Sequence, residues 1–307
     1  MAEPTAGTTF QELGRPATSF ERFRAAMRPN GYLRLARAYP QLGIGLTVLI
    51  LLVFAAVFAP LIAPYNPTDI DATARLETPN ADHLFGTDTL GRDTFSRILY
   101  GGRISLFVAL AAVSLGTVVG VALGLISGYG FGWLDTLIMR TADGLLAFPS
   151  LILALTIAFA LGASLQSIII ALSVVRIPGT ARLTRGQVLT LRNQDYILAA
   201  TAIGVPPPRL VLRHFLPNLV SIVLIQASLG AGAVIFAEAS LGFLGLGVPP
   251  PTPSWGGMLR DGYIFLEINP WQSVIPGALI FLAVLSFNFI GDGLRDMLDP
   301  RQRQLRG

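Results

Sequence analysis

The sequence predicts an all-α integral membrane protein with six transmembrane helices. Hydrophobic residues make up 52% of the chain and charged residues only 13%, whereas charged residues make up about a quarter of ordinary soluble domains. Several apolar runs without charge also exceed the ~18 residues that mark a bilayer span. Because soluble cores alternate apolar with polar residues, we expect most of this chain to lie in lipid.

The first span is expected at residues 42–63, after an arginine-rich tail at 1–41. A cleaved signal peptide would have a shorter charged region and an apolar core of only about 7–15 residues, so this run is interpreted as a retained membrane anchor. The segment 64–103 that follows is polar and rich in turn-forming residues. It is expected to form a folded loop outside the membrane.

Five further apolar segments follow. The second span is expected at 104–128, where small residues allow transmembrane helices to approach closely. Residues 144–175, between Asp143 and Arg176, are free of charge but too many for one crossing, and a turn at 161–164 is expected to divide them between a third and a fourth span. The fifth and sixth spans are expected at 218–248 and 271–290.

The distribution of arginine predicts the orientation of these spans. Six crossings place the tail at 1–41 and the tail at 293–307 on the same side of the membrane, with a core of five spans at 104–292 between the first loop and the second tail. Seventeen of the 22 basic residues, all arginines, fall on that side. The positive-inside rule therefore predicts that both tails are cytoplasmic.

Several kinds of chemistry are made improbable by the composition. The chain has no lysine, which a P-loop requires to hold nucleotide phosphates, so any ATP-driven motor is expected on another chain. It has no cysteine, and its two histidines, His83 and His214, fall in different predicted loops, so we expect no metal site. The net charge of +4 reflects the cytoplasmic arginines, and no nucleic acid partner is expected.

The longest polar stretch on the cytoplasmic side, residues 183–217, is predicted to form a helix, a turn and a second helix. Residues 185–202 contain good helix formers, and Gly204 is placed to end that helix. The prolines at 206–208 forbid its continuation. A second short helix then leads into the fifth span.

This loop presents a short apolar face beside three charged residues, a pattern suited to docking into a groove on a partner. The face consists of Tyr196, Ile197, Ala199 and Ala200, and the charged residues are Arg185, Arg192 and Asp195. A solvated connector is the alternative that the residues leave open. The residues assigned to this coupling loop, both on the docking face and in the turns beside it, are Arg185, Asp195, Tyr196, Ala199, Ala200, Gly204, Leu216 and Pro217.

The same loop resembles the signature of the permease subunits of ATP-binding-cassette importers. That signature reads E-A-A, three residues, G, nine residues, and I-x-L-P. The chain keeps the spacing at every step, but Leu198 replaces the glutamate and His214 replaces the isoleucine. The matching positions are Leu198, Ala199, Ala200, Gly204, His214, Phe215, Leu216 and Pro217.

Three more segments resemble, more narrowly, the second of the two permeases of the branch that imports dipeptides, oligopeptides and nickel. They lie at 83–106, 238–256 and 291–301 and occur in the family's order and spacing. Together with the loop, the resemblance extends from about residue 40 to residue 301.

The resemblance implies a type I importer permease fold in the bacterial plasma (inner) membrane, with the loop as a coupling helix seated in a cleft of an ATPase subunit. It implies as partners a second, homologous permease, two ATP-binding subunits, an extracytoplasmic substrate-binding protein and membrane lipid. ATP and Mg would be bound by the ATPase subunits, so no cofactor and no catalysis are expected in this chain. The missing acid at Leu198 leaves open any salt bridge from that position.

The implied function is to form half of the translocation pathway for di- or oligopeptides. The motifs do not separate peptides from nickel or another small solute. An ion-driven secondary transporter is the alternative from another class, and it would show several ionisable residues within the membrane. Only Glu238 is expected to be such a residue, and no internal repeat is visible.

Individual charged residues have two interpretations each. Glu238 lies within the fifth span and either lines the translocation pathway or makes a structural bond near the outer membrane edge. Four residues of the outer loop either pair with each other on a helix or contact the binding protein, namely Asp88, Arg92, Asp93 and Arg97. Trp255 and Trp271 are expected to be interfacial anchors.

Overall fold

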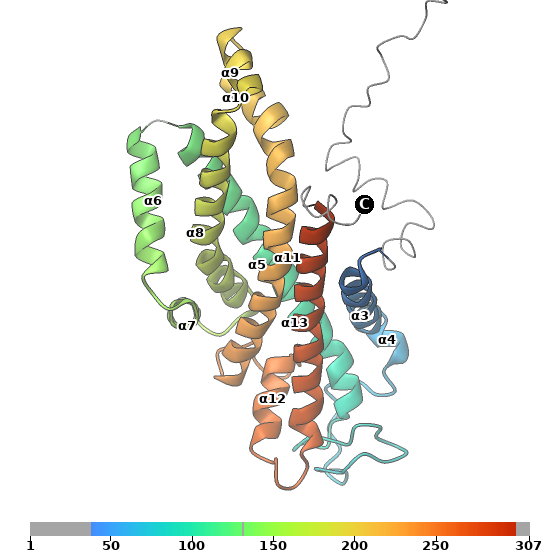
Figure 1. The fold of residues 1–307 in the computed structure, drawn as a ribbon. Helices are drawn as coiled ribbons and strands as arrows, with labels where there is room; N and C mark the ends of the chain where they lie inside the picture. The colour runs from blue at the N-terminus through green and yellow to red at the C-terminus, as the bar shows by residue number, and fades with distance from the viewer. Residues whose placement is uncertain (1–37, 131, 299–307) are drawn as a thin grey trace, which may run out of the picture.

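The computed structural model describes residues 38–130 and 132–298, which form helices joined by turns and one long loop (Figure 1). The predicted all-α class is confirmed. Most of the predicted tail at 1–41 and the end of the tail at 293–307 lie outside the described residues. The helices are α3 (Pro40–Val57), α4 (Ala59–Ile62), α5 (Thr94–Tyr129), α6 (Gly132–Leu146), α7 (Ser150–Leu161), α8 (Leu165–Arg192), α9 (Asp195–Ala202), α10 (Pro207–Leu210), the π-helix η1 (Val211–Phe215), α11 (Leu216–Phe243), α12 (Trp255–Tyr263) and α13 (Trp271–Leu298).

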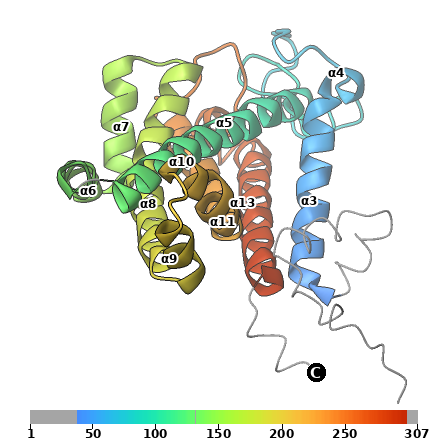
Figure 2. The ribbon, with the colours of Figure 1, turned by 90° about the horizontal axis from the view of Figure 1, so that it is seen from above.

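Within the described residues, five helical segments are long and apolar enough to cross a membrane, and a sixth crossing arises if α6 and α7 count as one span. The predicted third span is bent by 96° between these two helices. Pro149 explains the break, because a proline disfavours helical conformation in the residue before it and has no N–H to continue the ladder. In Figure 2, α7 stands along the bundle while α6 is seen end-on.

The second span begins earlier than expected, because α5 extends over 36 residues from Thr94. Asp93 is its N-cap, and its carboxylate accepts a 2.7 Å hydrogen bond from the backbone N–H of Ser96. This cap allows the polar residues that precede the apolar run to continue the helix outward. The long helix α5 crosses the bundle obliquely, from the side of α3 and α4 to the side of α6 and α8 (Figure 2).

Glycines on α5 let α8 approach closely. They recur every four residues, so they share one helix face. A Cβ added to Gly120 would lie 2.6 Å from the Cβ of Thr180, and one added to Gly124 would lie 2.5 Å from that of Thr184. Gly116 and Gly128 continue the stripe against Arg176 and Val188. Small residues spaced in this way are typical of tightly packed transmembrane helix pairs.

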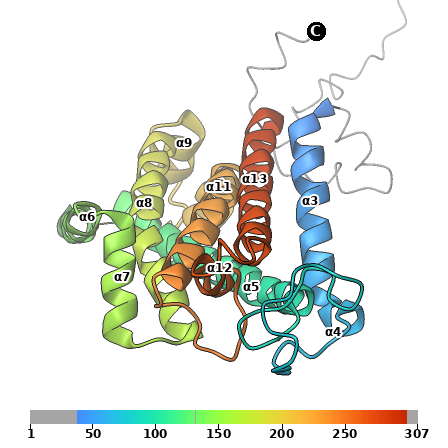
Figure 3. The same cartoon turned by 90° about the horizontal axis from the view of Figure 1, so that it is seen from below.

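The two ends of the bundle are distinct. The turn between α7 and α8 and the loop at 64–93 lie at one end, which we call the outer end (Figure 3). Helix α9, the start of α3 and the end of α13 lie at the other, which we call the inner end (Figures 2 and 3). The loop at 64–93 is tied to the start of α13, because the side-chain amide of Asn269 donates a 2.8 Å hydrogen bond to the carbonyl of Glu77 and Gln272 donates to the carbonyl of Thr87.

Candidate coupling surface and charged residues of the bundle

Helix α9 projects from the inner end of the bundle between α8 and α10 (Figure 1). Gly204 ends it with φ +79°, a conformation that glycine adopts without steric cost. The N–H of Gly204 donates to the carbonyl of Thr201 at 3.0 Å, and the N–H of Val205 donates to that of Ala200 at 3.1 Å. These two bonds form a Schellman motif. The sequence therefore placed the end of this helix correctly. The prediction of a single helix over 185–202 was wrong, because α8 ends at Arg192 and α9 begins at Asp195 after a turn at Asn193 and Gln194.

The prolines that follow begin the next helix rather than merely ending the previous one. Pro206 is the N-cap of α10, and Pro207 and Pro208 are its first two residues. Proline is favoured there because the first N–H groups of a helix have no partner within it. The sharp turn between α9 and α10 is therefore fixed by Gly204 on one side and by prolines on the other.

A π-helical turn joins this region to α11. Pro217 has no N–H, so it cannot donate to the carbonyl four residues earlier. The N–H of Leu216 bonds to the carbonyl of Val211, five residues earlier, which is the π pattern. Leu216 and Pro217, which the sequence assigned to the docking face, thus set the junction with α11.

A small apolar core holds α9 in place. Ile197 of α9 does not lie on the docking face as predicted, because its side chain points into the bundle and is 1% exposed. It packs in a cluster with Leu210, Phe215 and Leu219, which precede or begin α11. Val188 of α8 completes the cluster, and Ala200 packs on its edge. Because buried apolar side chains are close-packed, α9 is rigidly connected to both α8 and α11.

Four large apolar residues of α9 and of the segment that follows it are exposed. We define the coupling surface as Tyr196, Leu198, Ile203 and Leu212, which are 45%, 53%, 82% and 67% exposed. Of these residues, the sequence had assigned only Tyr196 to the docking face. Ile203 and Leu212 lie in the same predicted loop, but the sequence alone does not distinguish them from its buried apolar residues such as Ile197 and Leu210. Asp195 and Ala199 are also exposed. Asp195 lies in the first turn of α9, where its negative charge interacts favourably with the helix dipole.

Arg185 does not lie on this surface. Its Nε and Nη2 atoms each lie 2.6 Å from one carboxylate oxygen of Asp135 in α6. The hydroxyl of Ser127 donates a further hydrogen bond to the same carboxylate. A second pair, Asp143 with Arg182, also links α6 to α8. The geometry therefore gives Arg185 a structural role, that of holding α6 against the bundle.

Glu238 is 1% exposed within α11, and neither of its carboxylate oxygens has a hydrogen-bond partner among the described residues. Nearby, helix α12 packs directly on α11, since a Cβ added to Gly256 would lie 2.6 Å from the carbonyl oxygen of Ala239. This position gives the carboxylate no open face, and the bond that the structural interpretation requires is not formed among the described residues either. Its role in the translocation pathway stays a prediction.

Trp255 is not an interfacial anchor. It is 2% exposed, and its indole N–H donates a 3.1 Å hydrogen bond to the carbonyl of Ile98 in α5. The backbone N–H of Trp255 donates to the hydroxyl of Ser105 at 3.3 Å. The glycines of α5 make the room for its ring, because a Cβ added to Gly102 would meet it at 3.0 Å. Trp271, by contrast, is 48% exposed.

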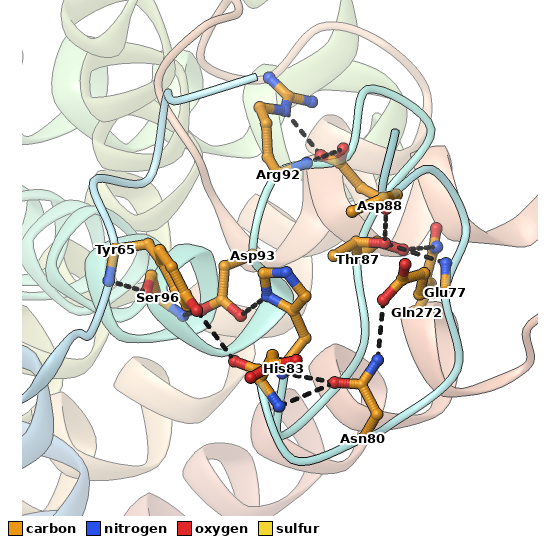
Figure 4. A network of polar contacts seen from close by, with 12 residues as sticks. Tyr65, Glu77, Asn80, His83, Thr87, Asp88, Arg92, Asp93, Ser96 and Gln272 are labelled. Atoms are coloured by element: carbon orange, nitrogen blue, oxygen red, sulfur yellow. Dashed lines mark hydrogen bonds and ion pairs between the residues drawn. The ribbon is translucent and has the colours of Figure 1, made fainter. Parts of the chain in front are cut away.

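The four charged residues of the outer loop form a buried network. Asp88 lies 2.7 Å from the Nε of Arg92 and 3.3 Å from the Nε of Arg97. Asp93 pairs with His83 at 2.9 Å instead of with Arg97, because it precedes α5 as the N-cap and points back toward the loop (Figure 4). All four are between 3% and 8% exposed. This geometry supports internal pairing and leaves them little surface for contact with a binding protein.

A further intramembrane charge was missed by the sequence analysis, which placed Arg176 at the edge of the fourth span. It is the twelfth of the 28 residues of α8, and α8 continues to Arg192. Its Nε atom is buried without a hydrogen-bond partner among the described residues. Glu238 is therefore not the only ionisable residue within the membrane-spanning helices.

The chain matches the family described as "Binding-protein-dependent transport system inner membrane component" over residues 120–304. It also matches the "N-terminal TM domain of oligopeptide transport permease C" over residues 43–79.

Relatives of known name agree with these matches. The chain is 45% identical over 260 residues to the dipeptide transport system permease protein DppC of Alkalihalophilus pseudofirmus, which covers 85% of this chain and 86% of that protein. It is 41% identical over 261 residues to the oligopeptide transport system permease protein OppC of Bacillus subtilis, with 85% and 86% covered. It is 45% identical over 253 residues to the glutathione transport system permease protein GsiD of Escherichia coli, with 82% and 84% covered. The chain therefore belongs to the family of inner membrane components of binding-protein-dependent transport systems, the permease subunits of ATP-binding-cassette importers.

Proposed function

We propose that this chain forms half of a translocation pathway for di- or oligopeptides and that partner ATPases drive it through α9. The observation that carries the proposal is the coupling surface, an exposed apolar patch at the inner end of the bundle. Ile197 and its buried neighbours connect this patch rigidly to α8 and α11. A push on α9 is therefore transmitted to two membrane-spanning helices.

The proposed assembly contains a second, homologous permease, two ATP-binding subunits and an extracytoplasmic binding protein. ATP and Mg are bound by the ATPase subunits, and this chain performs no covalent chemistry and holds no cofactor. The absence of lysine supports the assignment of ATP binding to other subunits, because a P-loop needs a lysine to hold the nucleotide phosphates. The complex would alternate between inward-open and outward-open states around a site near the middle of the membrane.

The orientation follows from the same surface. ATPases of an importer work in the cytoplasm, so α9 would face the cytoplasm of the bacterium. The start of α3 and the end of α13 lie at the same end of the bundle as α9 (Figure 2). Both termini are therefore proposed to be cytoplasmic, in agreement with the arginine distribution.

Peptides are favoured as the substrate because the relatives are named for dipeptide, oligopeptide and glutathione transport. The test is uptake into proteoliposomes that contain the complete importer with its binding protein. We expect ATP-dependent uptake of radiolabelled di- and trialanine and no uptake of ⁶³Ni²⁺. Uptake of ⁶³Ni²⁺ alone would assign the chain to the nickel importers, and uptake driven by an ion gradient without ATP would contradict the proposal altogether.

A further inference from the structure

We propose that Arg176 contacts the carboxylate of the peptide as it passes the middle of the membrane. This inference rests on the proposed function and deepens it by naming the chemical group that the pathway recognises. It begins from the energetic cost of a charged side chain within a bilayer, where ionisable residues face a polar partner or a water-filled path.

Arg176 lies near the middle of the bundle. It is the twelfth of 28 residues in α8, and its guanidinium lies against Gly230, the fifteenth of 28 residues in α11. A Cβ added to Gly230 would lie 1.7 Å from Nη1 and 2.3 Å from Cζ. Only glycine at position 230 leaves room for the guanidinium in this orientation. Two helices thus shape the position of this charge.

No acid of the described chain neutralises Arg176. It makes no hydrogen bond or ion pair with any described residue, and its Nε atom is buried. Two other arginines of α8 do have acidic partners, because Arg182 pairs with Asp143 and Arg185 with Asp135. An anion that neutralises Arg176 would therefore come from outside the described residues.

Open space lies beside the guanidinium. A cavity of about 260 Å³ between α7, α8 and α11 is lined by Arg176 and by nine residues that are mostly small or apolar. A second, apolar cavity of about 520 Å³ lies between α11, α12 and α13. Phe236 lines both cavities. The cavity beside Arg176 suits a carboxylate at one end of a molecule. The apolar second cavity suits the uncharged body of that molecule.

The face of α11 at these cavities is not a lipid-type surface. Gln226, Gly230, Ala233, Ala237 and Ser240 follow each other at spacings of four, three, four and three residues, so they share one face of the helix. Gln226 is exposed at mid-helix, and two other positions of this face, Ala233 and Ala237, line the smaller cavity. Polar side chains at this depth are expected along a water-filled path.

The position of Arg176 also connects recognition of the peptide to the ATPase subunits. Helix α8 continues from Arg176 to Arg192 with Pro178 inside it, and α9 begins three residues later at Asp195. A movement of α9 by the ATPase would therefore displace the guanidinium. The carboxylate contact would form in one state of the importer and be released in the other.

The test compares trialanine with trialanine amide in proteoliposomes that contain the complete importer, each probe at a concentration that saturates the binding protein. We expect Arg176→Gln to lower the uptake of trialanine about tenfold, since a charge-assisted hydrogen bond is lost. Uptake of the amide should change less than about twofold, because it has no carboxylate for the guanidinium to bind. Arg176→Lys should keep more trialanine uptake than Arg176→Gln, because lysine retains the charge. Arg140→Gln, an exposed arginine of α6, is the matched control and should change neither uptake.

Unchanged trialanine uptake in Arg176→Gln would overturn the inference. An equal loss of uptake for trialanine and for trialanine amide would overturn it too. That result would point to an acidic residue of the second permease as the partner of Arg176. If the wild-type importer takes up neither peptide, the proposed function fails instead.

A second measurement covers the case in which Arg176→Gln does not assemble. The chain has no cysteine, so Arg176→Cys provides a unique thiol in it. In the importer with its other cysteines replaced, we expect a charged, membrane-impermeant methanethiosulfonate to label this thiol, and saturating trialanine to slow the labelling. A thiol that resists labelling both with and without ATP would place Arg176 outside the pathway.

Discussion

Arg185 and Asp135, fifty residues apart in the sequence, face each other with two hydrogen bonds of 2.6 Å. The parallel arrangement is the fork geometry that arginine alone offers to a carboxylate. It joins α8, which leads to the coupling surface, to α6, which stands at the edge of the bundle beside α8 (Figure 1). The pair is partly solvated, with side chains 32% and 24% exposed, so its contribution to stability is modest.

Replacing Arg185 and Asp135, singly and together, should reveal the interaction energy between the two side chains. We expect Arg185→Gln and Asp135→Asn each to lower the free energy of unfolding, and the double variant to lose less than the sum by about 1 kcal/mol. The measurement is a double-mutant cycle by denaturant titration in detergent. The affinity of Arg185→Gln for the ATPase subunits should stay within about twofold of wild type. Additive losses would show that the pair contributes no coupling energy, and a large fall in ATPase affinity would restore Arg185 to the coupling surface.

Gly204→Val should uncouple transport from ATP hydrolysis. The positive φ of Gly204 disfavours a β-branched residue by about 1–2 kcal/mol, although the space around it is open, with nothing within 4 Å of an added Cβ. The end of α9 should therefore shift, and peptide uptake and substrate-stimulated ATPase activity should fall together while the chain still inserts. Gly204→Asn is the control, because asparagine tolerates this conformation and should retain most activity. Full coupling in the valine variant would favour the solvated-connector alternative.

Ile203→Ser should weaken binding of the ATPase without affecting the fold. Ile203 is 82% exposed, so its removal leaves no cavity. If it is buried in the cleft of the ATPase, we expect the dissociation constant of the permease–ATPase complex to rise about tenfold. Leu61→Ser is the matched control, since Leu61 is 81% exposed and belongs to α4, near the outer loop. The measurement is titration of labelled ATPase onto permease in nanodiscs, and equal affinities for the two variants would remove Ile203 from the contact.

Asp261 should make stability depend on pH. Burial raises the pKa of this carboxyl above its ordinary value of 3.8, although Arg97 and Arg92 act in the opposite direction. Between 3.8 and the raised value, the folded chain holds a proton that the unfolded chain has lost, so stability falls as pH rises through this window. Asp261→Asn should remove this contribution of the carboxyl, so the stability of the variant should depend less on pH. Thermal unfolding in detergent across the acid range checks the prediction, and parallel curves for the two proteins would refute it.

The apolar runs and the turn residues were sufficient to predict much of the fold. Charge-free runs place the spans because burying an unpaired charge in lipid is costly. Gly204 ends α9 as expected, since the need for a positive φ is a local property. Pro149 was a similar local signal for the bend between α6 and α7, but the sequence analysis did not use it.

The sequence by itself determined the helical class, the approximate spans, the end of α9 and the family loop, because hydropathy, helix ends and motif spacing are all read along the chain. Only the tertiary structure decided that Arg185 pairs with Asp135, that Trp255 is buried against α5, and that Arg176 finds no partner among the described residues. Those outcomes depend on how the helices rotate and approach each other. The glycines of α5 set that approach, and no local pattern specifies which distant side chains then meet.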